Sequence, residues 1–158
     1  MEATLRVLVC GSRDWNDIDT IYATLDGLYL QATMGHLSVE ISEFVLIEGG
    51  APGADSIAAQ WAKNSPTHSY NEKPDDPHFE HLQFRADWRK YGKAAGPLRN
   101  QQMLDEGKPD VVRAFKNNFD WVWLDSNGKQ WKHLYHGTED MVRRARAATI
   151  PCYVVSRA

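Results

Sequence analysis

Short apolar runs alternate along the chain with longer segments in which apolar residues recur every three or four positions. The runs lie at residues 5–10, 44–47, 111–115 and 151–155, with a shorter one at 82–84. Unbroken runs of this length are typical of strands that are buried on both faces of a parallel sheet. The pattern therefore predicts about five strands.

The segments between these runs predict helices. Asp17 is placed to cap the first helix, in which Ile21, Leu25 and Leu28 share one face. The predicted helices span residues 17–33, 54–64, 94–106 and 138–148. Strands that alternate with helices in this way form a three-layer, Rossmann-like α/β domain with a mainly parallel sheet of about five strands. We expect residues 1–158 to form a single domain of this kind.

Two segments interrupt the regular alternation. Residues 65–81 are polar and contain three prolines, so we expect a long surface loop. Residues 117–135 contain Trp121, Trp123 and Trp131 around a turn-forming Asp-Ser-Asn-Gly-Lys stretch, which predicts a hairpin-like insertion.

Composition narrows the classes of partner. Hydrophobic residues make up 42% and charged residues 25% of the chain, as expected for a protein with a packed core. The formal net charge of −3 gives no overall attraction to nucleic acid, although basic residues gather between 85 and 99. No apolar run approaches the ~20 residues that cross a bilayer, and the N-terminal residues lack the layout of a signal peptide. We therefore expect a cytoplasmic protein that contacts no membrane.

The two cysteines, Cys10 and Cys152, lie at the edges of apolar runs. In a cytoplasmic α/β domain this placement predicts two small buried residues and no disulfide. A catalytic thiol at Cys10 is the alternative, because this residue abuts a glycine-bearing segment.

Three glycine-bearing segments provide the candidate chemistry. They are Gly11 to Trp15, Glu48 to Asp55 and, more loosely, His136 to Thr138, and each leads into a predicted helix. Glycine lets the backbone approach a ligand closely, and the free N–H groups of a helix N-terminus favour an anion at the carboxyl ends of the strands. We therefore predict a pocket for a phosphate-bearing small molecule. Its predicted residues are Gly11, Ser12, Arg13, Trp15, Gly49, Gly50, Gly53, Ala54, Asp55, Arg99, Gly137 and Thr138.

The side chains of this set suggest different parts of the ligand. The guanidinium groups of Arg13 and Arg99 suit contacts with phosphate. Asp55 is either a first-turn carboxylate that favours the helix dipole or an acceptor for ribose hydroxyls, since it would repel a phosphate. Trp15 either stacks on a base or covers the core, and Thr138 is at least a helix cap.

Five motifs, taken in order, resemble a known family. They are Gly-Ser-Arg-Asp-Trp from Gly11, Gly-Gly-Ala-x-Gly-Ala-Asp from Gly49, Ala-Asp-Trp from Ala86, Ala-Gly-Pro-x-Arg-Asn-x-x-Met from Ala95 and Gly-Thr-x-Asp-Met-Val-Arg-Arg-Ala from Gly137. The chain resembles the YspA/YpsA-related branch of the SLOG superfamily, which also includes the DNA-processing protein DprA and the LOG phosphoribohydrolases. The resemblance implies a Rossmann-like fold that binds nucleotides or nucleotide-derived ligands, a homodimer or higher oligomer, and a bacterial or phage source. The tryptophan-rich insertion is a candidate interface for that oligomer.

One position departs from the LOG enzymes. Their Gly-Thr-x-x-Glu motif carries a catalytic glutamate, and Met141 stands at that position here. The stretch from Arg99 to Met103 does parallel their Arg-Lys-x-x-Met. If the chain nevertheless hydrolyses nucleotides, the candidate catalytic residues are Arg99, Asp55, Asp87 and Glu139, with Glu48 as a further carboxylate.

The sequence leaves three functions open. The first is a sensor or binding protein for a nucleotide-derived small molecule, without a cofactor. The second is an N-glycosidase or phosphoribohydrolase acting on nucleoside monophosphates, which needs a carboxylate to stabilise an oxocarbenium-like state or to activate water. The third, DprA-like nucleic-acid binding, is disfavoured by the acidic balance. His78, Glu80 and His81 match no metal-ligand spacing, so we expect no metal site.

Overall fold

The apolar runs form the strands of a five-stranded sheet in the order β3-β2-β1-β4-β7. The computed structural model describes residues 3–34, 40–64, 77–117, 122–132 and 137–157. All four neighbouring strand pairs of the sheet are parallel. The predicted α/β fold with about five parallel strands is therefore confirmed.

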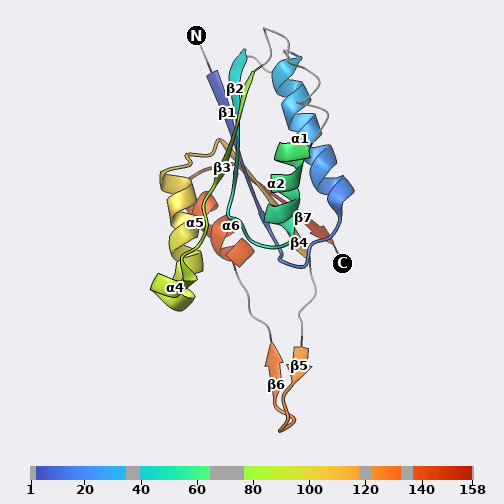
Figure 1. Ribbon diagram of the computed structural model, residues 1–158, viewed down its shortest axis with the longest axis vertical. Coiled ribbons are helices and arrows are strands. Elements are labelled where there is room, and N and C mark those ends of the chain that lie inside the picture. Colours follow the sequence, from blue (N-terminus) through green and yellow to red (C-terminus); the bar gives the residue numbers. More distant parts are fainter. Residues whose placement is uncertain (1–2, 35–39, 65–76, 118–121, 133–136, 158) are drawn as a thin grey trace.

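The strands of this sheet are β1 (Ala3–Gly11), β2 (Ile41–Glu48), β3 (His78–Gln83), β4 (Val111–Asn117) and β7 (Cys152–Arg157). The helices are α1 (Ile18–Thr33), α2 (Ala54–Asn64), α4 (Trp88–Tyr91), α5 (Ala95–Asp105) and α6 (Gly137–Ala147), with a 3-10 turn, η1 (Gly92–Ala94), before α5. Helices α1 and α2 cover one face of the sheet, and α5 and α6 cover the other, with α4 beside α5 (Figure 1).

Successive residues of the central strand β1 serve the two faces of the sheet. Val7 and Val9 belong to the core beneath α1 and α2, whereas Leu8 and Cys10 belong to the core beneath α5 and α6. All four side chains are buried. Burial on both faces explains why the strand segments of the sequence are continuously apolar rather than alternating.

The strand order places a topological switch beside β1. The chain moves outward from β1 to β2 and β3, then crosses back to β4 and continues to β7. Open α/β sheets bind ligands outside the carboxyl ends of the strands at such a point. The segment after β1 and the segment after β2 both lie at this edge of the sheet.

Three differences from the prediction concern β3, α6 and α4. Strand β3 begins at His78, because the chain pairs with β2 from Glu43 onward. The loop expected over 65–81 therefore ends before His78. Residues 65–76 lie outside the described residues. Helix α6 begins at Gly137, which places Thr138 in its first turn rather than at the cap. The short helix α4 was not predicted at all, since four residues are too few to show a helical period.

The tryptophan-rich segment contains the predicted hairpin. Strands β5 (Val122–Leu124) and β6 (Gln130–Lys132) pair antiparallel, and their turn places Gly128 at φ of +74°. The hairpin projects away from the carboxyl edge of the sheet (Figure 1). Trp121 lies outside the described residues.

Both cysteines are free thiols: Cys10 is buried and Cys152 is half-buried. Burial raises the pKa of the Cys10 thiol well above its usual value, with the charge of Asp55 as a further cause. A thiol held neutral in this way is a poor nucleophile. In the described part of the chain, no helix has the length and apolar character needed to cross a membrane.

Candidate functional site

Gly11 and Gly53 bring the first two glycine-bearing segments into direct contact. A Cβ on Gly11 would lie 2.5 Å from Cβ of Ala54, and one on Gly53 would lie 2.3 Å from the carbonyl oxygen of Ser12. Gly53 also has φ of +78°, a conformation that favours glycine. The backbone N–H of Ala54 donates to the same Ser12 carbonyl at 3.3 Å. The predicted segments are therefore packed against each other at the carboxyl ends of β1 and β2.

Ser12 also joins the first segment to β4. Its backbone N–H donates to the Phe115 carbonyl at 2.8 Å, and its hydroxyl oxygen accepts from the backbone N–H of Asn117 at 3.0 Å. The side-chain Nδ2 of Asn117 donates to Asp14 at 3.0 Å, while its buried Oδ1 has no hydrogen-bond partner among the residues that the structure describes. The carboxyl end of β4 thus forms one wall of the site beside Ser12.

The second glycine-bearing segment uses its own carboxylates to hold its backbone N–H groups. Oδ2 of Asp55 accepts from the N–H groups of Gly49, at 3.1 Å, and Ala51, at 3.3 Å. Oε2 of Glu48 accepts from the N–H of Gly50. These three donors, which were expected to face a phosphate, are therefore already paired within the protein.

Asp55 is buried, and its pKa is raised to about 7. Burial is the largest cause, and the nearby charge of Glu48 acts in the same direction. The positive charge of Arg99 and the two backbone N–H groups lower the pKa and offset part of the effect. A carboxyl group with this pKa exchanges its proton near neutral pH, which ordinary aspartates do not.

Glu48 ends β2 with a fully buried side chain. Its Oε1 accepts hydrogen bonds from Nε2 of His81, at 2.9 Å, and Nε2 of Gln83, at 2.7 Å. Sequence reasoning does not connect these three residues. A clue was present, because His81 and Gln83 are two positions apart in β3 and therefore lie on the same face of the strand. The contacts fix Glu48 at the start of the second glycine-bearing segment.

Arg99 and Asn100 connect the second glycine-bearing segment to the third. Nη1 of Arg99 donates to the carbonyl oxygen of Gly49, and its Nε donates to Oδ1 of Asn100 at 3.1 Å. Nδ2 of Asn100 then donates to the Gly137 carbonyl at 3.1 Å and to Asp140 at 3.0 Å. A chain of buried and partly buried polar contacts therefore runs from the end of β2 to the start of α6.

Two tryptophans at the first segment differ in their exposure to solvent. Trp15 is 3% exposed and packs on Phe115 with 5.5 Å between ring centroids, so it covers the core. Trp88, which opens α4, is 44% exposed, and the guanidinium of Arg13 lies 5.4 Å from its ring centroid. Sequence reasoning gave Trp88 no part in the site.

The remaining candidate carboxylates lie on other elements and have local partners. Asp87 is exposed and caps α4 by accepting from the backbone N–H of Lys90 at 3.0 Å. Glu139 forms an ion pair with Lys116. Met141, at the position of the LOG glutamate, is buried in the core. Asp55 and Glu48 are the carboxylates that the fold brings together with Arg99.

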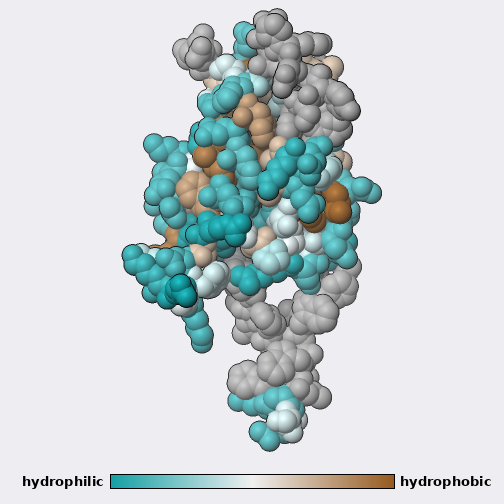
Figure 2. Space-filling view, in the orientation of Figure 1, coloured by the Kyte–Doolittle hydropathy of each residue, from teal (hydrophilic) through white to brown (hydrophobic). Residues whose placement is uncertain are grey.

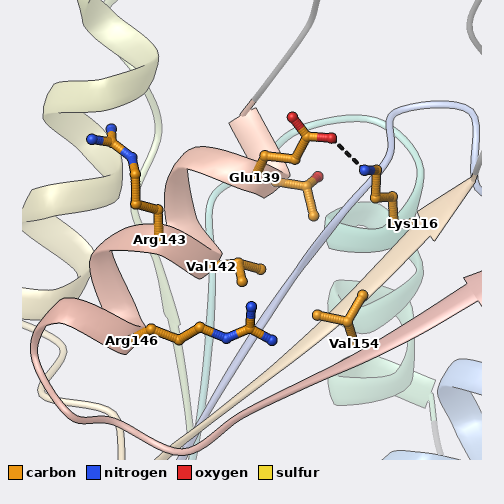
Figure 3. Close-up of a pocket in the computed structure, with 7 residues that line it drawn as sticks. Lys116, Glu139, Val142, Arg143, Arg146 and Val154 are labelled. Carbon is orange, nitrogen blue, oxygen red and sulfur yellow. Dashed lines mark hydrogen bonds and ion pairs between the residues drawn. The ribbon is translucent and has the colours of Figure 1, made fainter.

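An open hollow of about 480 Å³ adjoins the third glycine-bearing segment. It lies between α6 and the strands β4 and β7, with Val142 and Val154 facing each other across it and the Lys116–Glu139 pair at one end (Figure 3). Its lining also includes Thr138, Arg143 and Arg146. The hollow shares Thr138 with the predicted pocket, but none of the predicted residues of the first two segments lines it.

Comparison with known proteins gives two matches. The profile of the YspA, cpYpsA-related SLOG family matches residues 5–91. The chain is 37% identical over 110 residues to the Gene 61 protein of Mycobacterium phage D29, a match that covers 70% of this chain and 75% of the phage protein. No solved structure matches the chain. The matched family segment contains the first two glycine-bearing segments and the stretch that includes Trp88.

Proposed function

Because the chain belongs to the YspA, cpYpsA-related SLOG family, we propose that it binds a nucleotide or nucleotide-derived small molecule at the carboxyl ends of β1, β2 and β4. One observation carries this proposal: three glycine-bearing segments, far apart in the sequence, are joined at that edge by Ser12, Arg99 and Asn100. Such a convergence of glycine turns and helix N-termini is the usual setting for a phosphate-bearing ligand.

Asp55 and Glu48 favour the sugar of the ligand, not its phosphate, at the second glycine-bearing segment. The N–H donors of Gly49, Gly50 and Ala51 are paired with these carboxylates. An added phosphate would meet negative charge instead of free donors. Ribose hydroxyls are neutral donors, and an ionised carboxylate accepts strong hydrogen bonds from them.

The phosphate is then best accommodated between the first and third segments. Arg13 is an exposed cation in the first segment, and Gly137 and Thr138 open α6, an eleven-residue helix. The N-terminus of such a helix carries partial positive charge and stabilises an anion. In this arrangement Arg99 acts mainly by holding Gly49 and Asn100, and through them the shape of the site.

Mass spectrometry of small molecules released from the purified protein, followed by incubation with candidate nucleotides, tests the proposal. We expect a nucleotide or nucleotide derivative among the released molecules, or saturable binding of one from the added panel. A protein that releases none and binds none would contradict the proposal.

A second candidate function is N-glycosidic hydrolysis of nucleoside monophosphates. The observation in its favour is Asp55, whose pKa of about 7 suits a group that gives or takes a proton at neutral pH. The buried Met141 at the position of the LOG glutamate weighs against a LOG-type mechanism. Release of free base distinguishes this candidate from simple binding.

A further inference from the structure

We propose that Trp88 is the surface on which the planar base of the ligand stacks, an inference that rests on the function proposed above. Trp88 is 44% exposed, whereas Trp15 and Trp61 are 3% and 0% exposed. An aromatic ring of this size stabilises a fold strongly when it is buried, so an exposed one contributes little to the core. Trp88 is thus available for another contact.

The backbone leading to Trp88 crosses the candidate site. The N–H of Phe84 donates to the Glu48 carbonyl at 2.9 Å, and Arg85 then passes so close to Gly50 that an added Cβ there would lie 3.0 Å from Cγ of Arg85. Three residues later, the Trp88 ring meets the guanidinium of Arg13 from the first segment. The ring therefore stands beside the first glycine-bearing segment, and the stretch that leads to it lies against the second.

The contact with Arg13 indicates which ligand groups can stack on the Trp88 ring. A guanidinium is flat and cationic, and it lies on aromatic faces in the same way as a purine or pyrimidine does. Stacking on an aromatic side chain tolerates any base, because every base has a π-face. Trp88 would therefore supply affinity for the base, while Asp55 contacts the sugar.

Helix α4 is suited to this role because none of its residues is buried. It extends from the layer that contains α5, and the surface at its position is hydrophilic (Figures 1 and 2). Asp87 caps the helix and so fixes the residue that follows. The short helix thus fixes the position of Trp88 at the edge of the candidate site.

Three variants and two kinds of probe test the inference. The variants are Trp88→Ala, Trp88→Phe and Tyr91→Ala. Tyr91 is the matched control: it lies on the same helix, is 46% exposed and has its own cation, Lys90, at 5.0 Å from the ring centroid. Calorimetry measures the affinity for the four common ribonucleoside monophosphates, and ribose 5-phosphate, which lacks a base, is measured as a competitor. Thermal melting checks that each variant is folded.

We expect Trp88→Ala to weaken nucleotide binding about tenfold or more, since base–aromatic stacking contributes at this level. Trp88→Phe should retain most of the affinity, and Tyr91→Ala all of it. Ribose 5-phosphate should bind all variants equally. Unchanged nucleotide affinity in Trp88→Ala, or an equal loss for ribose 5-phosphate, would overturn the stacking role. If the unmodified protein binds neither probe, the proposed function itself fails.

Discussion

At the scale of single residues, Asp55 is the most informative side chain of the site. It is buried beside another carboxylate, yet two backbone N–H groups and Arg99 favour its ionised form. The balance leaves its pKa at about 7, so small changes in its surroundings decide its charge at neutral pH. A ligand hydroxyl that donates to Asp55 favours the charged form and therefore lowers this pKa.

Binding of a ribonucleoside should therefore strengthen as the pH rises through 7. Adenosine is the suitable probe, because it has no phosphate that titrates in this range. If adenosine binds the ionised form of Asp55, its affinity should increase up to about tenfold between pH 6 and pH 8, following the pKa of about 7. Isothermal titration calorimetry at several pH values measures this change.

Asp55→Asn is the control for the pH dependence, since the amide keeps an acceptor oxygen but does not titrate. Its affinity for adenosine should be independent of pH over the same range. The ribose role of Asp55 would be refuted by an affinity that falls as the pH rises, or by the same pH dependence in Asp55→Asn.

Gly53 offers a prediction about stability. Replacement by Ala places a Cβ within 2.6 Å of backbone atoms of Ser12 and Arg13, at a φ of +78°. Because backbone cannot move aside cheaply, we expect Gly53→Ala to destabilise the protein by about 2 kcal/mol or more. Chemical denaturation measures the free energy of unfolding.

Gly27→Ala is the matched comparison for Gly53→Ala. Gly27 lies within α1, and a Cβ there would meet nothing within 4 Å. Alanine is the better helix former, so this change should stabilise the protein by about 0.5–1 kcal/mol. Equal effects of the two changes would show that the contact between the first two segments does not constrain the fold.

At the scale of elements, the β5–β6 hairpin is separate from the main sheet. Its two strands pair with each other and form a two-stranded sheet of their own. We therefore expect that replacing residues 118–136 by a short Gly-Ser linker leaves the parallel sheet folded, as circular dichroism would report.

We also propose that the hairpin supports assembly of two or more copies. The shortened chain should therefore form a smaller assembly than the full chain, as measured by light scattering. A shortened chain that assembles like the full one would remove the hairpin as the interface.

The elements also show how far the sequence is informative. Continuous apolar runs predict β1, β2 and β4, because burial on both faces leaves a direct trace in the sequence. An apolar run also predicts β7, although this edge strand has no buried residue. The sequence does not predict the His78 end of β3, since this strand is at the edge of the sheet and only Phe79 and Leu82 of its 6 residues are apolar. The first two glycine-bearing segments lie at the carboxyl ends of β1 and β2, as the sequence predicts. The pairing of Glu48 and Asp55 with backbone N–H groups depends on a turn geometry that residue types do not reveal.

At the scale of the whole molecule, the proposed binding edge has no LOG-type glutamate. Met141 is buried, and Glu139 beside it is paired with Lys116. We therefore predict no appreciable release of free base when the four common ribonucleotides are incubated with the protein and separated by chromatography. Base release that is absent in Asp55→Asn would reverse this prediction and identify Asp55 as the catalytic carboxylate.

The most direct test of the central claim compares nucleotide affinity in two arginine variants. Arg13→Ala removes an exposed cation from the first segment, and Arg99→Ala removes the buried guanidinium that holds Gly49 and Asn100. Lys63→Ala, at the opposite end of α2 from Asp55, is the control for a simple loss of charge. With calorimetry on the nucleotide that binds best, each arginine variant should lose about 1–3 kcal/mol of binding free energy, and Lys63→Ala none. Arg13→Ala removes a charge-assisted hydrogen bond to the ligand, whereas Arg99→Ala removes the buried contacts that shape the site. Unchanged nucleotide affinity in both arginine variants would contradict a ligand site at this edge of the sheet.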